Sequence, residues 1–264
     1  MKISLSLFLA TCLFLSCTKN SNSDAGSASG QTDFSVYLTD DPGLYDKVNI
    51  DIQSVEVHFA DDANGDAWHT LHMIHPGVHN LLKLTNGKDT LLATERIAAK
   101  KITQVRFILG PDNSVVINGT SYPLKTPSAQ ESGLKFNVDA TLTAGIEYKI
   151  WTDFDVTRSI VVTGNNQFIL KPVIRVYTKA VSGSINGIVL PPAANPWVYV
   201  LNGNDTIASA KPDTLTGTFM VNGLAAGSYA VSIDGNNNFT DTLYNNVDVS
   251  VGNVTDIGTT LLHQ

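Results

Sequence analysis

Four aspartates near the ends of predicted strands are the residues of this chain best suited to chemistry. Asp153 and Asp155 stand two positions apart in the segment TDFD, and Asp40 and Asp41 close another alternating segment. Alternate residues of a strand share one face at a spacing of about 6–7 Å. Carboxylates so placed can hold a cation or polar ligand, act as general acid and base, or form ion pairs that organise a sheet.

Ion pairs are the simplest of these three roles, and Arg158 and Arg106 are the expected partners. Acid–base catalysis lacks support because no nucleophile motif accompanies the carboxylates. Neither Gly-x-Ser-x-Gly nor a phosphate-binding loop occurs in the sequence, so acyl and phosphoryl transfer are not indicated. We therefore expect a protein that is not an enzyme. A cation or polar-ligand site at these four aspartates stays open as the alternative.

Three histidines lie close together in the sequence between residues 69 and 75. On a helix His69, His72 and His75 would share a face, and imidazoles at that spacing suit Zn²⁺. A Pro-Gly pair follows and breaks such a helix, and Trp68–Met73 fits a strand, which sends His69 and His72 to opposite faces. We expect a solvated hairpin end, with a zinc site as the alternative.

A neighbouring segment resembles the first half of a calcium-binding loop. Asp62, Asn64 and Asp66 alternate as the first ligands of such a loop do. The loop also needs a glycine and then a glutamate, and this chain has Ala67 and Leu71 at those places. A polar hairpin tip built on an Asn-Gly turn is therefore expected, with Ca²⁺ as the alternative.

The N-terminal segment predicts a lipid anchor. Lys2 precedes an apolar run that ends in Leu15-Ser16-Cys17, which is the layout of a secretory signal. About 13 apolar residues reach roughly 20 Å as a helix, too short for a hydrocarbon core of about 30 Å. The tripeptide resembles the bacterial lipobox. That resemblance implies cleavage after residue 16, a diacylglycerol on the Cys17 thiol, and acylation of the new amino terminus by a fatty acid such as palmitate.

Residues 17–32 then form a flexible tether rich in Ser, Gly and Asn. Thr18 follows the cysteine and Asp24 is the only acid in the tether, which resembles sorting to the outer membrane with the protein facing the periplasm. The formal net charge is −7 and no Lys/Arg cluster is present, so no nucleic-acid partner is expected. Attachment to the membrane must then come from the lipid alone.

Alternation of apolar and polar residues dominates the remaining chain and predicts strands. One helical turn or two is expected at 78–84, and Trp68, Trp151 and Trp197 are expected to pack in cores rather than to form a stacking surface for sugars. The strands predicted for residues 33–180 are 34–38, 48–52, 55–59, 105–109, 115–117, 134–138, 148–154, 160–162 and 168–177. About seven more follow in the roughly 80 residues of 181–264, which is typical of a small sandwich. The predicted fold is all-β, with two consecutive β-sandwich-like domains after the signal peptide (1–16) and the tether.

Two family resemblances accompany these patterns. The first is carried by Leu38-Thr-Asp-Asp41-Pro42, Val55-Glu-Val57-His58, Gln104-Val-Arg106, Asp153-Phe-Asp155 and Leu170-Lys-Pro172. These residues resemble the bacterial lipoprotein family catalogued as domain of unknown function 4382, which implies a β-rich exported domain without an established activity. The second is carried by Gly183-Ser-Ile-Asn-Gly187, Thr216-Gly-Thr-Phe219 and Ala226-Gly227-Ser-Tyr229. They resemble a carboxypeptidase-regulatory-like, prealbumin-type sandwich, although the zinc motif of the enzymes beside which such modules occur is missing.

These observations predict a non-enzymatic, lipid-anchored envelope protein with a structural, adhesive or protein-interaction role, and with an envelope protein or a glycan as partner. The alternative is a glycan- or cation-binding accessory lipoprotein of the outer membrane. No cofactor is expected, with Ca²⁺ or Zn²⁺ left open.

Overall fold

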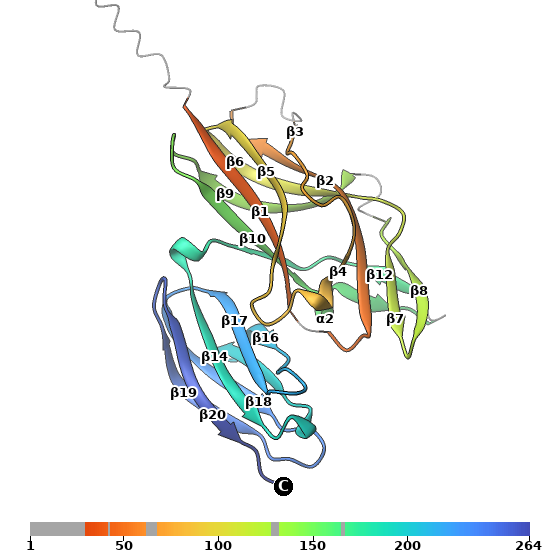
Figure 1. The fold of residues 1–264 in the computed structure, drawn as a ribbon, viewed down its shortest axis with the longest axis vertical. Coiled ribbons are helices and arrows are strands. Elements are labelled where there is room, and N and C mark those ends of the chain that lie inside the picture. Colours follow the sequence, from red (N-terminus) through yellow and green to blue (C-terminus); the bar gives the residue numbers. More distant parts are fainter. Residues whose placement is uncertain (1–29, 42, 62–67, 128–131, 165–166) are drawn as a thin grey trace, which may run out of the picture.

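The computed structural model describes residues 30–41, 43–61, 68–127, 132–164 and 167–264. Their regular structure is almost entirely strand, arranged as four sheets in two units, each with its own hydrophobic core (Figure 1). The first unit contains β1 to β13 and the second contains β14 to β20. The predicted all-β fold class is therefore confirmed.

The smaller sheet of the first unit has the order β13-β10-β1-β5. Its strands are Ile174–Tyr177 (β13), Tyr148–Asp155 (β10), Gln31–Asp41 (β1) and Thr90–Ala98 (β5). β1 runs parallel to β10 and antiparallel to β5. Phe34, Val36 and Leu38 alternate along β1 and are fully buried, because every second side chain of a strand faces the same layer.

The larger sheet has the order β11-β12-β8-β7-β2-β6-β9, and β3 and β4 also pair with β2. Its strands are Ile160–Val162 (β11), Phe168–Leu170 (β12), Thr120–Lys125 (β8), Ser114–Ile117 (β7), Lys47–Phe59 (β2), Lys101–Leu109 (β6), Leu134–Thr141 (β9), Trp68–Thr70 (β3) and Gly77–Asn80 (β4). The two strands predicted at 48–52 and 55–59 are one strand, β2, with a register shift between Ile52 and Ser54. Bulges of this kind bend a strand without ending it.

The strand predicted at 168–177 is in fact two strands that belong to different sheets. β12 pairs with β8 and β11 in the larger sheet, whereas β13 pairs with β10 in the smaller one. Pro172 lies in the break between them. Proline cannot donate a ladder hydrogen bond, so the chain leaves one sheet there and enters the other.

The helix predicted at 78–84 is wrong for half its length. Residues Gly77–Asn80 form β4, which pairs with β2, and only Leu81–Lys83 form a 3₁₀ turn, η1. The long-range pairing with β2 decides the conformation of this segment, and Leu81 is then buried in the core. Local propensity is a weak guide where a neighbouring strand offers hydrogen bonds.

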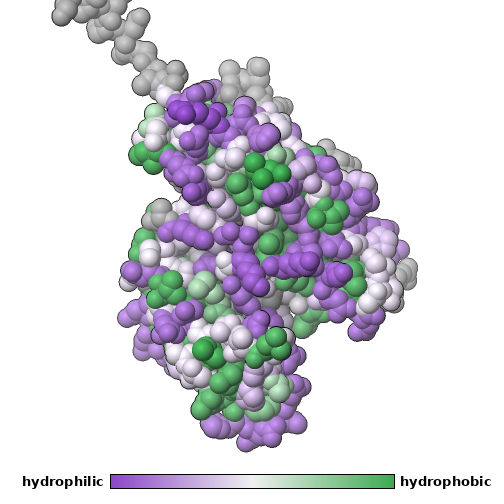
Figure 2. Space-filling model, in the orientation of Figure 1, coloured by the Kyte–Doolittle hydropathy of each residue, from purple (hydrophilic) through white to green (hydrophobic). Residues whose placement is uncertain are grey.

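The second unit packs a three-stranded sheet, β17-β14-β20, with a four-stranded sheet, β16-β15-β18-β19. Its strands are Gly183–Leu190 (β14), Trp197–Asn202 (β15), Asp205–Ala210 (β16), Thr218–Leu224 (β17), Gly227–Asp234 (β18), Thr242–Val249 (β19) and Val254–Leu261 (β20). Its core includes Ile185, Val198 and Val231. On the face drawn in Figure 2, hydrophobic residues form separate groups among hydrophilic ones. None of the helices in the described part of the chain is long and apolar enough to cross a membrane.

Candidate functional site

The four aspartates singled out in the sequence meet at one end of the smaller sheet. β1 and β10 run parallel, so they end side by side, and their register pairs Thr39 with Asp153 and Asp41 with Asp155. All four carboxylates are buried: Asp40 and Asp153 are 4% exposed, and Asp41 and Asp155 are 8% exposed. We call this group the acidic junction.

Two arginines pair with the acidic junction. Nη2 of Arg175, on β13, lies 2.5 Å from Oδ2 of Asp153, which is its register partner on β10. Nε of Arg158 lies 2.5 Å from Oδ2 of Asp155, and the Arg158 backbone N–H donates to Oδ1 of the same carboxylate. Asp155 thereby caps α2, the short helix Val156–Ser159. The ion-pair role is present for these two aspartates.

The partner residues were only half anticipated. Arg158 is in place, but Arg106 is not: it lies on the larger sheet and pairs with Glu56 at 2.6 Å. Arg175 was missed because the predicted strand 168–177 hides the break at Pro172. Only after that break does β13 lie beside β10 and bring the guanidinium to Asp153.

The second unit closes the acidic junction from the other side. Nη2 of Arg175 donates to the carbonyl of Asn222 at 3.1 Å, and its Nη1 donates to that of Gly223 at 3.4 Å. The backbone N–H of Ser209 donates to Oδ2 of Asp41 at 3.4 Å. Arg175, which pairs with Asp153, therefore also binds β17, and Asp41 binds β16.

A close backbone approach strengthens this contact. Gly223 has φ +72°, and a Cβ at that position would lie 2.5 Å from the ring of Tyr177. Glycine is the residue that meets both demands, because it tolerates positive φ and leaves room for the ring. Nearby, Nδ2 of Asn86 in the first unit donates to the carbonyl of Lys211 in the second at 2.9 Å.

Asp40 is the least satisfied member of the acidic junction. Neither of its carboxylate oxygens has a hydrogen-bond partner, and Oδ1 of Asp153 lacks one too. Burial raises the pKa of Asp40 well above its ordinary value, and the neighbouring charges of Asp153, Asp41 and Asp155 raise it further. Burial likewise raises the pKa of Asp41, with Arg175 partly opposing the shift. The geometry therefore favours a protonated Asp40.

The charge balance leads to the same conclusion. The acidic junction holds four carboxylates but only two ion pairs, Arg158 with Asp155 and Arg175 with Asp153, so full ionisation would leave two negative charges unpaired in a buried place. The cavity there measures about 10 Å³, which is room for about one water molecule. Within the described residues, no group of three or more His, Cys, Asp or Glu side chains is arranged to hold a metal ion. Protonation of a carboxyl group relieves this charge.

The predicted histidine segment lies away from the acidic junction, on and beside β3. His69 is exposed on β3, the backbone N–H of His72 donates to Glu95, and the backbone carbonyl of His75 contacts the ring of His79. Of the residues proposed for calcium, Asp62, Asn64 and Asp66 lie outside the described residues, as does Cys17.

The tryptophans occupy three different environments. Trp151 is 8% exposed and stacks between Tyr37 and Tyr177 on the outer face of the smaller sheet, and its Nε1 donates to Asp89. Trp197 is 7% exposed. Trp68 is half-buried beneath the guanidinium of Arg106, whose Cζ lies 4.2 Å from the ring centre.

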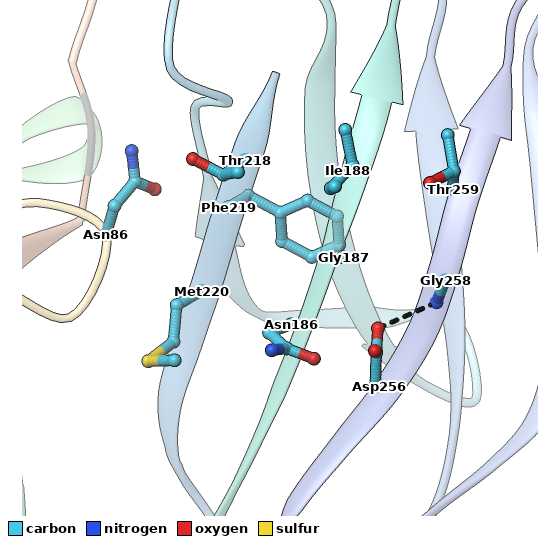
Figure 3. A pocket seen from close by; sticks show the side chains of 10 residues that line it. All are labelled: Asn86, Asn186, Gly187, Ile188, Thr218, Phe219, Met220, Asp256, Gly258 and Thr259. Atoms are coloured by element: carbon cyan, nitrogen blue, oxygen red, sulfur yellow. Dashed lines mark hydrogen bonds between the residues drawn. The ribbon is translucent and has the colours of Figure 1, made fainter. Parts of the chain in front are cut away.

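A groove of about 380 Å³ lies next to the acidic junction, on the outer face of β17, β14 and β20 (Figure 3). Three strands and the turn before β5 line it, and sequence reasoning did not find it. The lining residues are Asn86, Asn186, Gly187, Ile188, Thr218, Phe219, Met220, Asp256, Gly258 and Thr259.

A bulge in β20 makes the groove. Asn186 on β14 pairs with Asp256, but Ile188 pairs with Thr259, so β20 holds an extra residue at this point. Gly258 has φ +76° and no atom within 4 Å of the place of its missing Cβ. Figure 3 shows its backbone N–H bonded to Asp256, and the distance to Oδ1 is 2.8 Å. The extra residue and its missing side chain hollow the sheet.

The fold and this site define a protein class: a two-unit, all-β protein whose buried carboxylates join its units. The chain belongs to the family described as Domain of unknown function (DUF4382), whose profile matches residues 31–172. No curated protein sequence matches the chain.

Three solved structures resemble it remotely. The Bacillus anthracis TIE protein has a TM-score of 0.25 and 10% identity over 88% of this chain, which spans 35% of that protein. The shaft pilin SpaA from Lactobacillus rhamnosus GG has a TM-score of 0.22 and 8% identity, and the match covers 89% of this chain and 99% of the pilin. The minor pilin GBS52 of Streptococcus agalactiae has a TM-score of 0.23 and 8% identity, and the match covers 87% of this chain and 95% of the pilin. Likenesses this remote carry no argument about function.

Proposed function

We propose that this protein is a non-enzymatic, lipid-anchored envelope protein with a structural, adhesive or protein-interaction role. The proposal rests on the position of the acidic junction, the largest cluster of reactive side chains described above. Asp41 and Asp153 are buried beside the second unit: Asp41 accepts from the backbone N–H of Ser209, and the half-buried Arg175, which pairs with Asp153, donates to the carbonyl of Asn222. Carboxylates closed in this way brace two sandwiches and cannot reach a substrate.

Surface composition supports an interaction role for the second unit. Several of its large hydrophobic side chains are exposed, and Figure 2 shows hydrophobic groups on the lower unit. The most exposed of them in this unit are Leu215, Leu243, Val251, Val254 and Leu261. Exposed apolar side chains mark an interaction site where they form a contiguous patch, and we propose that the second unit contacts another envelope protein through these residues.

The N-terminal sequence supports the anchor. We propose cleavage before Cys17, lipidation of its thiol and attachment to the outer membrane with the protein facing the periplasm. The seven strands of the second unit, three in one sheet and four in the other, support the carboxypeptidase-regulatory-like assignment proposed for residues 181–264.

Membrane fractionation followed by crosslinking in intact cells tests the proposal. We expect Cys17→Ser to move the protein from the membrane to the soluble fraction with its fold unchanged. Cys12→Ser is the matched control and should stay in the membrane, because Cys12 lies in the apolar run that is removed. Crosslinking of the anchored protein should yield a defined adduct with an envelope protein. A strictly monomeric protein that forms no adduct would contradict the interaction role.

A second candidate is a glycan-binding accessory role. The groove of Figure 3 favours it, because two buried amide oxygens there have no partner.

A further inference from the structure

We propose that the groove on β17, β14 and β20 binds a neutral, hydroxyl-rich ligand of the carbohydrate class. The inference rests on the second candidate function and supplies its site and ligand chemistry. The volume of about 380 Å³ falls within the range of small-ligand sites, which is about 300–1,000 Å³. Strands of the second unit supply its floor and the first unit supplies one wall (Figure 3).

Unpaired hydrogen-bond acceptors indicate what the ligand must offer. Oδ1 of Asn86 and Oδ1 of Asn186 are buried and have no partner. Nδ2 of Asn86 is already bonded to the carbonyl of Lys211, which fixes the orientation of that amide. Figure 3 shows the Asn86 oxygen turned toward β17 and the Asn186 oxygen turned toward β20. An amide oxygen only accepts, so a complementary ligand must carry donors.

The charge of the lining selects a neutral ligand. Asp256 is the only charged residue among the described lining residues, and one of its oxygens already accepts from Gly258. No cationic side chain lines the groove within the described part of the chain, so an anionic ligand would find repulsion and no counter-charge. The hydroxyls of Thr218 and Thr259 add groups that both donate and accept.

Apolar side chains lie beside these polar groups. Ile188 and Met220 stand among the polar residues in Figure 3, and Phe219 lies beneath them with 3% exposure. A sugar ring offers hydroxyl donors at its rim and C–H groups on its faces, which matches this alternation. None of the described lining residues is an exposed aromatic side chain, so we expect weak binding.

A peptide strand fits the groove less well. Strand addition uses a sheet edge, which here is β17 or β20, whereas the groove lies across β14, which is paired with both of them. Recognition here must therefore use side chains on the face of a sheet, which suits a compact polyol better than an extended backbone.

The groove is complete only when the two units are in contact. Asn86 belongs to the first unit, and the place of a Cβ on Gly87 would lie 2.8 Å from the sulfur of Met220. Thr39 on β1 holds this turn through hydrogen bonds to the carbonyls of Leu84 and Lys88, and Arg175 binds β17, so the contact between the units also sets the geometry of the groove.

Isothermal titration of the full-length chain in detergent tests the proposal with four probes: maltohexaose, cellohexaose, laminarihexaose and N-acetylchitohexaose. We expect saturable binding of at least one, with a Kd of about 1 mM or lower. Asn86→Ala and Asn186→Ala should each weaken it about tenfold, and Thr218→Trp should abolish it by filling the groove. Asn245→Ala, an exposed asparagine on β19, is the matched control and should bind as the wild type does.

Two results would overturn the inference: no saturable binding of any probe at millimolar concentration, or binding that survives both Asn186→Ala and Thr218→Trp in variants with wild-type melting temperatures. Either result, combined with an intact crosslink to an envelope protein, removes the sugar site and leaves the structural role standing.

Discussion

Asp40→Asn should stabilise this protein at neutral pH, although it removes a buried charged residue. The side chain is 4% exposed and neither oxygen has a hydrogen-bond partner. An amide fills the same space and carries no charge. A buried polar group left unpaired costs about 1–3 kcal/mol, and an ionised one costs more. We therefore expect Asp40→Asn to gain at least about 1 kcal/mol once the wild-type carboxylate is ionised.

The pKa of Asp40 determines how the stability of the wild type changes with pH, and hence the direction of the predicted difference. The folded-state pKa of Asp40 is raised above its ordinary value of 3.8, so the folded protein holds this proton after the unfolded chain has lost it. The stability contributed by the neutral carboxyl is complete below the ordinary pKa. It is then lost as the pH rises through the folded-state value.

One proton difference changes the free energy of unfolding by about 1.4 kcal/mol per pH unit. The advantage of Asp40→Asn should therefore be near zero at about pH 4, grow at up to that slope, and level off above the folded-state pKa. For a chain of this size, each kcal/mol shifts the melting temperature by about 2–4 °C.

Urea unfolding followed by tryptophan fluorescence between pH 4 and 8 measures this difference. Asp33→Asn is the matched control, because Asp33 is exposed on the same strand, and it should show no such growth with pH. A variant that is less stable than the wild type at pH 7–8 would refute the reasoning.

Two further substitutions test the contact between the units. Arg175→Ala should lower the free energy of unfolding by about 3–5 kcal/mol, because it leaves a buried carboxylate unpaired. Arg175→Lys should not restore this stability, because an ammonium group cannot bind a carboxylate and two carbonyls at once as the guanidinium does. Calorimetry at neutral pH measures both variants, and full rescue by lysine would contradict this explanation. Gly223→Ala should separate the units, because its Cβ would strike Tyr177, and small-angle scattering should report a larger radius of gyration. Gly203→Ala is its matched control, since Gly203 also has positive φ but faces open space, so equal scattering changes in both variants would refute the steric explanation.

Local alternation predicted most strands of this fold, because each strand buries one face. The strands at 34–38 and 148–154 correspond to β1 and β10, and the spacing of Asp153 and Asp155 predicted correctly that they share a face. β5 was missed because its apolar residues do not alternate strictly, and β8 because it has few of them. Neither segment shows the regular alternation of apolar and polar residues from which strands are predicted.

The site required information that no local pattern contains. Arg175 reaches Asp153 only through the pairing of β10 with β13, which are separated by a crossing from one sheet to the other. Asn186 and Asp256 are neighbours only because β14 and β20 are parallel. Such contacts join residues far apart in the chain. The glycine in the segment Asp256-Ile-Gly258 was a usable signal of the bulge, since glycine within a strand often marks one.

The central position of β1 has a mechanical consequence. This strand begins at Gln31; its residues 31–38 pair with β5 on one side, and its residues 34–41 pair with β10 on the other. Interstrand hydrogen bonds run across the strand axis, so a pull on the chain at Gln31 loads the two ladders in shear, and many bonds must fail together. A hairpin pulled from one end would instead open one bond at a time. Force applied at Gln31 therefore acts first on β1, which resists extension because it is paired with a strand on each side.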